Sequence, residues 1–243
     1  MHQVQPVFSD AIAIIPARGG SKRVPDKNIR VMNGQPALWW VIQSAFNSGQ
    51  FSRIVVSTDD EDTSDIARTA GAEVPFLRPA ELGGDAVPLR EVIRHSLSCL
   101  YDRGDDNQSV CCLYATAVLL DPTDLSRSFT SWMTHEQFTA TIAVTAYPHP
   151  IERAMHLSSS GQVSFIEPDN AVARTQDLGV QVYDAAQFCW ASRSTWLGPE
   201  SILNNALGYR VPSWRAVDID DEDDWTHATL LHYALENLRK SSD

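Results

Sequence analysis

The sequence is poor in basic residues, with 19 lysines and arginines against 31 aspartates and glutamates and a formal net charge of −12. Nucleic acids and anionic membranes require a basic surface, so we expect neither as a partner. No apolar run approaches the ~18 residues that a membrane-spanning helix needs. Residues 1–10 form a polar N-terminal tail rather than a signal peptide, and we expect a cytoplasmic protein.

Cysteine is also scarce, and its spacing excludes the common metal and redox motifs. The chain has four cysteines, Cys99, Cys111, Cys112 and Cys189, with no C-x-x-C pair among them. We interpret them as buried free thiols in a reducing compartment, because an unpaired cysteine usually behaves as a small apolar residue. No Ser/His/Asp or Cys/His set occurs at a recognisable motif spacing.

Apolar, branched runs alternate with amphipathic segments along the rest of the chain. The runs cover residues 11–15, 53–57, 110–114, 139–145 and 187–191, and helical patterns that begin with proline or aspartate cover residues 36–48, 60–70, 88–101 and 122–135. Short strands without polar alternation favour a parallel sheet that is buried on both faces and binds its ligand at the carboxyl ends of the strands. We therefore predict one α/β domain over residues 11–240. The segment 147–184 lacks this periodicity, and we expect an insertion for substrate binding or dimer contact.

The first predicted strand runs into a turn-prone loop that is rich in cations. The loop contains two adjacent glycines, a serine and four basic residues, Arg18, Lys22, Arg23 and Lys27. Such a loop suits a polyphosphate, because its cations can neutralise the charge that builds on phosphate oxygens as a bond breaks. Its spacing matches neither G-x-x-x-x-G-K-[ST] nor G-x-G-x-x-G, which disfavours a P-loop NTPase and a dinucleotide-binding protein.

A charged cluster of the opposite sign lies near the C-terminus. Asp218 and Asp220 are separated by one residue, and on a strand this spacing places both carboxylates on one face, where they can approach one hard cation. The acids at 221–224 precede a helical pattern and are better explained as capping and first-turn residues. The cation loop and the carboxylate pair together indicate a nucleoside triphosphate that binds with Mg²⁺, with Asp218 and Asp220 as metal ligands.

Several other residues have structural explanations that compete with functional ones. Asp59 and Asp60 follow a predicted strand, and capping of the next helix is favoured over a metal or ribose contact. Trp39 and Trp40 lie in a core helix, where packing is favoured over a stacking platform for a base. Arg78 is either a surface residue or a second contact to the anion that the first loop holds.

The first loop, Ile15-Pro-Ala-Arg-Gly-Gly-Ser-Lys-Arg-Val-Pro-Asp-Lys-Asn28, closely resembles the signature loop of the CMP-sialic acid synthetases and related nonulosonic acid cytidylyltransferases. The similarity extends over nearly the whole chain, through Val56-Ser-Thr-Asp-Asp60, Pro75-Phe-Leu-Arg-Pro-Ala-Glu-Leu82, Tyr114-Ala-Thr-Ala117, Pro150-Ile-Glu-Arg153, Arg174-Thr-Gln-Asp-Leu178, Tyr183-Asp-Ala-Ala-Gln-Phe-Cys-Trp190 and Val217-Asp-Ile-Asp220. The segments that begin at Tyr114, Arg174 and Asp184 look most like the pseudaminic acid branch. Sialate enzymes usually have a Gln-Pro-Thr-Ser-Pro-type segment in place of the first of these.

The resemblance implies a Rossmann-like nucleotidyltransferase fold and the reaction of CTP with a nine-carbon 2-keto sugar acid, foremost pseudaminic acid, with Mg²⁺ as cofactor. It implies catalytic roles for Arg18, Lys22 and Lys27. It implies nucleotide contacts from Ala17, Arg18, Gly20, Ser21, Lys22, Asn28, Arg78, Asp85 and Thr116. The sugar acid is expected to meet Arg174, Gln176, Asp184 and Gln187, with Arg174 as the bidentate partner of its carboxylate. The family also suggests a homodimer in which residues 147–184 meet the partner chain.

The chain departs from these relatives at three places. Val118 stands where they commonly have proline, Ala186 stands where they commonly have glycine, and residues 86–89 replace a hydroxyl-rich run that follows Asp85. These changes leave two alternatives beside the pseudaminate enzyme. One is the same reaction on legionaminic, sialic or another 2-keto sugar acid, and the other is a nucleotide-binding subunit without catalysis.

Overall fold

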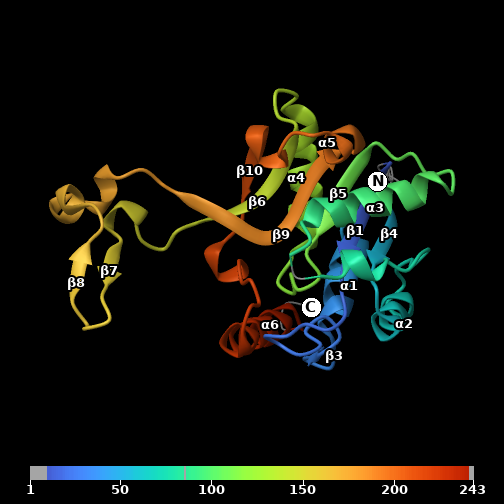
Figure 1. Ribbon diagram of the computed structural model, residues 1–243, viewed down its shortest axis with the longest axis horizontal. Helices are drawn as coiled ribbons and strands as arrows, with labels where there is room; N and C mark the ends of the chain where they lie inside the picture. The colour runs from blue at the N-terminus through green and yellow to red at the C-terminus, as the bar shows by residue number, and fades with distance from the viewer. Residues whose placement is uncertain (1–9, 85, 241–243) are drawn as a thin grey trace.

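The computed structural model describes residues 10–84 and 86–240, and a six-stranded sheet forms its centre (Figure 1). The strand order is β10-β6-β9-β5-β1-β4. The strands are β1 Ala11–Pro16, β4 Phe51–Ser57, β5 Ser109–Leu113, β6 Ala140–Ala146, β9 Val182–Ser192 and β10 Ala206–Arg210. β9 runs antiparallel to both of its neighbours, β5 and β6, and the other strands are parallel to one another. The predicted mainly parallel α/β sheet is confirmed.

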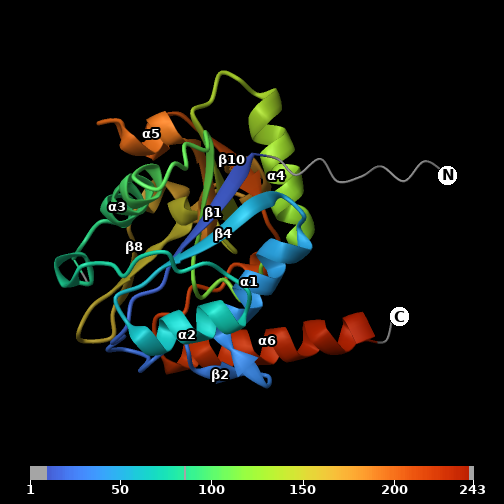
Figure 2. The same cartoon turned by 90° about the vertical axis from the view of Figure 1, so that its right-hand side faces the viewer.

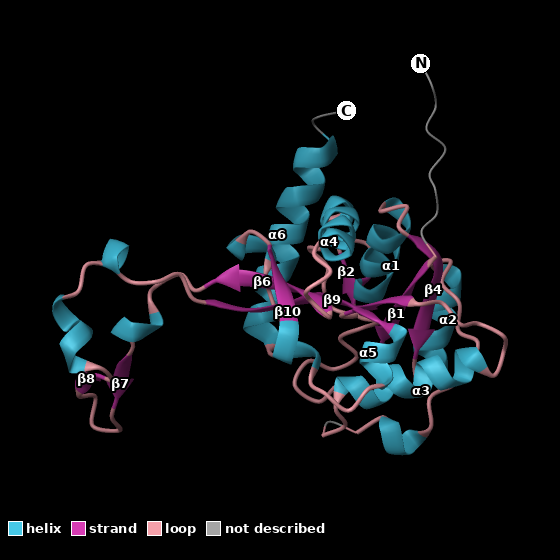
Figure 3. Ribbon diagram, turned by 90° about the horizontal axis from the view of Figure 1, so that it is seen from above, coloured by secondary structure: helices cyan, strands magenta, loops and turns pink. Residues whose placement is uncertain are grey.

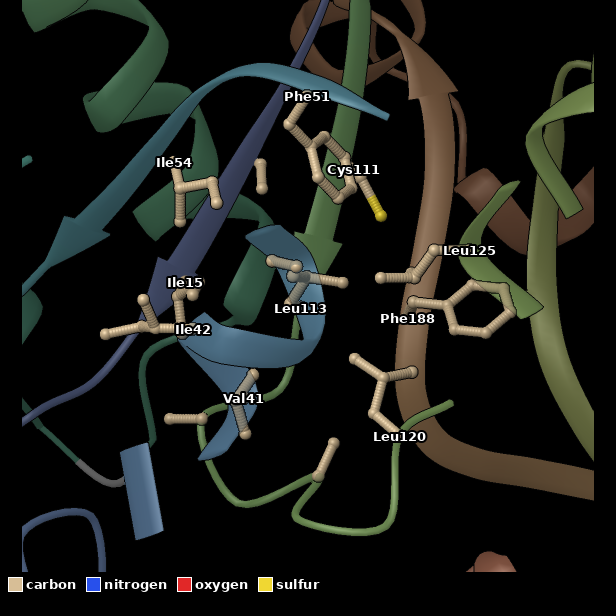
Figure 4. Packing of buried hydrophobic residues seen from close by; sticks show 14 of the residues in the cluster. Ile15, Val41, Ile42, Phe51, Ile54, Cys111, Leu113, Leu120, Leu125 and Phe188 are labelled. Carbon is tan, nitrogen blue, oxygen red and sulfur yellow. The ribbon is translucent and has the colours of Figure 1, made fainter. Parts of the chain in front are cut away.

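Helices cover both faces of this sheet, as expected (Figure 3). The helices around the sheet are α1 Ala37–Asn47, α2 Glu61–Thr69, α3 Leu89–Tyr101, α4 Pro122–Thr134 and α5 Arg193–Leu197. Successive side chains of a strand point to opposite faces, so alternate residues of β1 enter two different cores. Ile15 packs with α1 and α4, in the cluster drawn in Figure 4, whereas Ile14 packs with α3 and α5.

The helices begin where the sequence predicts. Asp60 is the N-cap of α2, and its carboxylate accepts a hydrogen bond from the Thr63 amide at 2.8 Å. In α1, the Trp40 indole donates to the Met32 carbonyl at 2.8 Å, and Trp39 packs against the core. Capping by Asp60 and structural packing of the two tryptophans are therefore confirmed.

A third packing unit lies below the carboxyl end of the sheet (Figure 2). It joins the C-terminal helix, α6 Glu222–Lys240, to the short hairpin of β2 Val31–Met32 and β3 Gln35–Pro36. Arg30 donates to the Glu222 carboxylate at 2.8 Å and lies over the Trp225 ring. This unit fixes the loop after β1 against the chain that leads into α6.

The expected strand at residues 217–220 is absent, because residues 216–220 have no regular secondary structure. Ile219 is nevertheless fully buried in the third packing unit, while Asp218 is exposed and Asp220 is half-buried. The strand prediction was therefore wrong. Ile219 still gives its two neighbours an outward orientation, because its own side chain is directed into the core.

Residues 147–181 form an arm that projects from the end of β6 and returns into β9 (Figure 1). The predicted insertion over 147–184 therefore ends three residues earlier than expected, because Val182–Asp184 already pair with β6. Its hairpin consists of β7 Met155–Leu157 and β8 Val163–Phe165. The 3₁₀ helices of the chain, three of them in the arm, are η1 Ala80–Leu82, η2 Ile151–Arg153, η3 Pro168–Val172, η4 Thr175–Asp177, η5 Ile202–Asn205 and η6 Ser213–Arg215. Ile166 and Leu157 of the arm are 64% and 67% exposed, so part of its apolar surface has no cover within the chain.

The cysteines are free, and Cys111, Cys112 and Cys189 are buried in the sheet. Burial raises the pKa of the Cys111 and Cys112 thiols well above the ordinary value, which makes them unreactive packing residues. Within the described part of the chain, none of the helices has the length and apolar character that crossing a membrane requires.

Candidate active site

The cation-rich loop leaves the carboxyl end of β1 and is fixed by its own backbone and by β4. The Ala17 amide donates to the Ser57 carbonyl at 2.9 Å, and the Gly19 amide donates to Asp59 at 3.0 Å. The Asn28 side chain closes the loop by donating to the Arg18 carbonyl at 2.9 Å. These bonds hold the loop in place before any ligand binds.

Glycine is required in this loop for two different reasons. Gly20 has a φ of +63°, a left-handed conformation that glycine adopts without strain. A Cβ on Gly19 would lie 2.8 Å from the Cβ of Asp60, so the loop approaches the start of α2 too closely for any side chain. The two adjacent glycines therefore turn the backbone and seat it against β4.

Asp59 joins this loop to Arg78, which the sequence left as either a surface residue or an anion contact. Arg78 is only 5% exposed and donates to Asp59 at 3.3 Å. Burial tends to raise the pKa of Asp59, but the Gly19 amide and the Arg78 charge hold this pKa below its usual value. Among the described residues, the Nε of Arg78 has no hydrogen-bond partner. A surface role for Arg78 is wrong.

A cavity of about 230 Å³ opens between these elements. Six of the predicted site residues line it, Arg18, Lys27, Asn28, Arg78, Thr116 and Asp218. They come from the loop after β1, the segment between α2 and α3, the chain after β5 and the chain before α6, so folding gathers them from distant parts of the sequence. Cations and a carboxylate thus face one another at the edge of the sheet where α/β proteins bind ligands.

The carboxylate pair is held by cations of the same loop. Lys27 donates to the Ile219 carbonyl at 2.7 Å, and Arg23 pairs with Asp220 at 2.7 Å. Burial lowers the pKa of Lys27, while Asp218 and Asp220 act in the opposite direction. The cavity walls and the charge of Asp220 raise the pKa of Asp218, although its side chain is open to solvent.

The surroundings of Asp218 and Asp220 suit a cation that takes few protein ligands. Within residues 10–84 and 86–240, no group of three or more His, Cys, Asp or Glu side chains is placed to hold a metal. Mg²⁺ typically takes one or two carboxylates and completes its shell with water and phosphate oxygens. A bound cation would also relieve the repulsion that raises the pKa of Asp218. The pair therefore fits Mg²⁺ in the company of a polyphosphate.

A second cavity, of about 420 Å³, adjoins the first and shares Leu89 and Tyr114 with it. Its walls are mainly apolar and include Ile142 and Trp196, with Asp184 as a charged member. The Tyr114 hydroxyl donates to Asp184 at 3.4 Å. Burial raises the pKa of Tyr114, which keeps this hydroxyl protonated as a donor.

Asp184 also shapes the backbone of β9 where the strand bulges. Its carboxylate accepts a hydrogen bond from the Ala186 amide at 2.9 Å, and Ala186 has a φ of +50°. A Cβ is strained in this conformation, which glycine adopts without cost. The bulge directs Asp184 toward Tyr114 and the second cavity.

The other predicted residues lie in several places. Gly20 borders a small pocket beside Arg18 and Asn28, and Ala17 is buried and contributes its backbone. Ser21 is half-buried, and Lys22 is exposed at the outer part of the loop. Asp85 lies outside the described residues.

The residues predicted to bind the sugar are dispersed. Arg174 and Gln176 are exposed on the projecting arm, where Arg174 pairs with Asp177 at 2.9 Å. Gln187 is 1% exposed, and its amide donates to the Arg215 carbonyl at 2.6 Å. Asp184 lines the second cavity, which adjoins the cavity of the cation loop. Sugar contacts by Arg174, Gln176 and Gln187 stay predictions.

Sequence reasoning missed two residues of this region. Tyr114 was noted only as part of a family segment, although it lines both cavities. Asp59 was interpreted as a possible cap beside Asp60, but it orders the cation loop instead. The sequence does not distinguish the aspartate that caps the helix from the one that binds the loop. The two side chains are identical and differ only in the direction in which the fold points them.

The fold and the paired cavities define a nucleotide-binding α/β enzyme of the nucleotidyltransferase class. Residues 12–171 match the family model described as cytidylyltransferase. The chain is 34% identical to the pseudaminic acid cytidylyltransferase of Campylobacter jejuni, over 91% of this chain and 95% of the relative. This chain belongs to the cytidylyltransferase family.

Two further comparisons agree with this assignment. The N-acylneuraminate cytidylyltransferase of Escherichia coli is 29% identical over 90% of this chain and 51% of its own length. A solved CMP:2-keto-3-deoxy-manno-octonic acid synthetase in complex with CTP superposes with a TM-score of 0.67, at 15% identity, over 94% of this chain and 100% of that chain. At this identity the superposition shows the fold, which is the predicted nucleotidyltransferase fold.

Proposed function

We propose that this protein transfers the cytidylyl group of CTP to pseudaminic acid, which yields the CMP-sugar and pyrophosphate. One observation carries the proposal: the cation loop, Arg78 and Asp218 line a single cavity that adjoins a second, mainly apolar cavity. A charged site for a triphosphate thus lies beside a site for an acceptor. The 34% identity to the Campylobacter jejuni enzyme, over 91% of this chain, supports pseudaminic acid among the possible acceptors.

The nucleotide side of the reaction follows from charge. A hydroxyl of the sugar acid attacks the α-phosphorus in line with the departing pyrophosphate. Arg18, Lys22 and Lys27 neutralise the negative charge that develops on the phosphate oxygens. Arg78 contacts the nucleotide from a site that Asp59 has already fixed, and its Nε has no hydrogen-bond partner among the described residues.

Asp218 and Asp220 are the proposed ligands of Mg²⁺. They would hold the cation, which would supply positive charge to stabilise the leaving pyrophosphate. Lys27 holds the carbonyl of the intervening Ile219, so the loop that meets the phosphates also fixes the carboxylates. Arg23 offsets the charge of Asp220 and would compete with the cation for it.

We place the acceptor in the second cavity, against Tyr114 and Asp184. Apolar walls suit the acyl and deoxy positions of a modified sugar acid, and Asp184 suits its hydroxyls. Arg174 and Gln176 lie on the arm, so we propose a homodimer in which the arm of one chain reaches the acceptor side of its partner. The exposed apolar residues of the arm support this arrangement. We also propose a cytoplasmic reaction that precedes glycan transfer to flagellin or an envelope polysaccharide.

A panel of acceptors tests the proposal. Pseudaminic, legionaminic and N-acetylneuraminic acid would each be mixed with CTP and Mg²⁺, and kcat/KM for pyrophosphate release would be compared. We expect the highest value with pseudaminic acid. A higher value with another acid supports the same reaction on a different acceptor. CTP binding without pyrophosphate release for any acid would leave only the non-catalytic subunit.

A further inference from the structure

The two proposed metal ligands lie on a segment that no helix or strand holds. Residues 216–220 are irregular, although a metal site needs its carboxylates in fixed positions. On the C-terminal side, Lys27 donates to the Ile219 carbonyl at 2.7 Å and Asp224 accepts the Asp220 amide at 2.9 Å. Both contacts hold the C-terminal half of the segment, so its N-terminal half needs a separate anchor.

Arg215, three positions before Asp218, is fixed through both its backbone and its side chain. The buried amide of Gln187 donates to the Arg215 carbonyl at 2.6 Å. The Arg215 guanidinium pairs with Asp124 of α4 at 2.7 Å and with Asp121 at 3.4 Å. Arg215 is only 8% exposed and Asp124 is also buried, so this pair is shielded from water, whereas Asp121 is partly exposed.

The same cluster reaches the wall of the nucleotide cavity. The backbone carbonyl of Gln187 accepts the Tyr114 amide at 3.0 Å, and Tyr114 lines both cavities. On the other side, the Tyr209 hydroxyl donates to Asp124 at 3.0 Å. Gln187 thus connects the end of β5, which shapes the cavity, to the chain that carries the carboxylates.

A contribution to stability does not by itself explain why buried polar residues occupy these positions. Burying an amide or an ion pair costs free energy, and an apolar cluster of similar volume is often at least as stable. Among the described residues, the Oε1 of Gln187 has no hydrogen-bond partner, so part of the cost is not recovered. What the cluster does provide is a directional bond to one carbonyl, which an apolar side chain does not supply.

We propose that Gln187, together with the Arg215–Asp124 pair, is a positioning residue for Asp218 and Asp220. In this role Gln187 acts through Arg215 and touches neither the metal nor the sugar. The inference rests on the proposed function, since it concerns the approach of the carboxylates to a metal-bound triphosphate. It differs from the sugar contact expected from the sequence, because it ties Gln187 to the metal side of the site.

The test is the substitution Gln187→Met, which keeps the length of the side chain and removes the bond to Arg215. Binding of Mn²⁺ in the presence of CTP would be measured by electron paramagnetic resonance. Residues that orient metal ligands typically change metal affinity by about 10-fold or more, so we expect roughly tenfold weaker Mn²⁺ binding. Hydrogen exchange of the metal-free chain should also become faster in the peptide that contains residues 216–220.

The matched control is Thr145→Val. Thr145 is buried, and its hydroxyl donates to the Val211 carbonyl at 3.1 Å, in the same stretch of chain but farther from the carboxylates. It should lower stability without changing Mn²⁺ affinity. Tyr209→Phe removes the hydroxyl from Asp124 and should weaken Mn²⁺ binding in the same direction but less, which keeps a test available if Gln187→Met does not fold.

The outcomes separate the two levels of the proposal. If wild-type protein binds Mn²⁺ with CTP, and Gln187→Met and Tyr209→Phe bind it equally well, the positioning role is wrong. It is also wrong if Thr145→Val weakens binding as much as they do, or if Gln187→Met raises only the KM for the sugar acid, which would be the expected sugar contact. If wild-type protein binds no Mn²⁺ with CTP, the proposed function itself fails.

Discussion

At the scale of single residues, neighbouring aspartates have different structural roles. Asp60 caps α2, while Asp59 fixes the cation loop and Arg78. Near the C-terminus, Asp221 accepts the amides of Asp223 and Asp224 at the start of α6. The structure therefore supports the predicted capping role of the acids that follow residue 220. The predicted metal-ligand role of Asp218 and Asp220 stays a prediction.

The ligand side gives a prediction at this scale. Asp220→Asn removes a charge from the proposed metal site and should lower kcat by roughly 10- to 100-fold, as expected when a metal loses an oriented carboxylate. Asp223→Asn should leave kcat unchanged, because its amide, not its carboxylate, takes part in the cap. Pyrophosphate release at saturating CTP measures both. Equal effects would mean that the ligands and the capping acids have been confused.

Ala186 gives a second prediction. Its φ of +50° strains any residue with a Cβ, so Ala186→Gly should raise the free energy of unfolding by up to about 1 kcal/mol. Ala185→Gly, at the adjacent buried position without this conformation, should instead lower it by about 1 kcal/mol. Urea unfolding of both variants checks the pair. A loss of stability in both variants would show that the bulge does not strain Ala186.

At the scale of elements, Asp59, which follows β4, joins the loop after β1 to the segment between α2 and α3, because it accepts the Gly19 amide and pairs with Arg78. Asp59→Asn leaves the buried Arg78 without its charge partner and should cost roughly 2 kcal/mol of stability near neutral pH. The exposed pair of Asp65 and Arg68 provides a control, since Asp65→Asn should cost less than about 0.5 kcal/mol. Both values come from urea unfolding.

The pH dependence of this loss has a definite sign. The pKa of Asp59 is lower in the folded chain than its ordinary 3.8, so the pair contributes its full stability above that value. The contribution disappears as the pH falls through the lower, folded pKa. The difference between wild type and Asp59→Asn should therefore shrink as the pH falls below 3.8. A difference that stays constant over this range would show that the charge of Asp59 is not what stabilises the folded state.

The sequence predicted the elements better than their details. Helix starts carry local signals, proline or a capping aspartate, and the structure has them where expected. The antiparallel direction of β9 has no such signal, because strand composition does not encode the direction of the neighbours. β10, Ala206–Arg210, was missed because it is a partly exposed edge strand with only alanine, leucine, glycine, tyrosine and arginine.

The site shows the same division. The cation loop and Asp218 were predictable, because a dense local cluster of charged residues is visible in the sequence whatever the fold. The interior position of Gln187 was not, because its bond to Arg215 joins residues that are 28 apart in the chain. Tertiary hydrogen bonds of this kind leave no periodic trace in the sequence.

At the scale of the whole molecule, the arm predicts the oligomeric state. Light scattering should give the mass of a dimer for the wild-type chain, because the arm exposes apolar residues and carries Arg174 away from the cavities. Ile166→Asp, on the arm, should shift the mass toward a monomer and reduce turnover. Val31→Asp, at a position that is also 64% exposed but lies on the β2–β3 hairpin, should leave the dimer intact. A monomeric wild-type chain with full activity contradicts the arrangement.

The central claim is that the adjoining cavities bring CTP and a sugar acid together for transfer. The most direct measurement is the release of pyrophosphate and the formation of CMP-sugar on mixing the purified chain with CTP, Mg²⁺ and pseudaminic acid. We expect equal amounts of both products, no product when Mg²⁺ is removed by a chelator, and none for Asp218→Asn. Binding of CTP with no pyrophosphate, or equal turnover after removal of divalent metal, would contradict it.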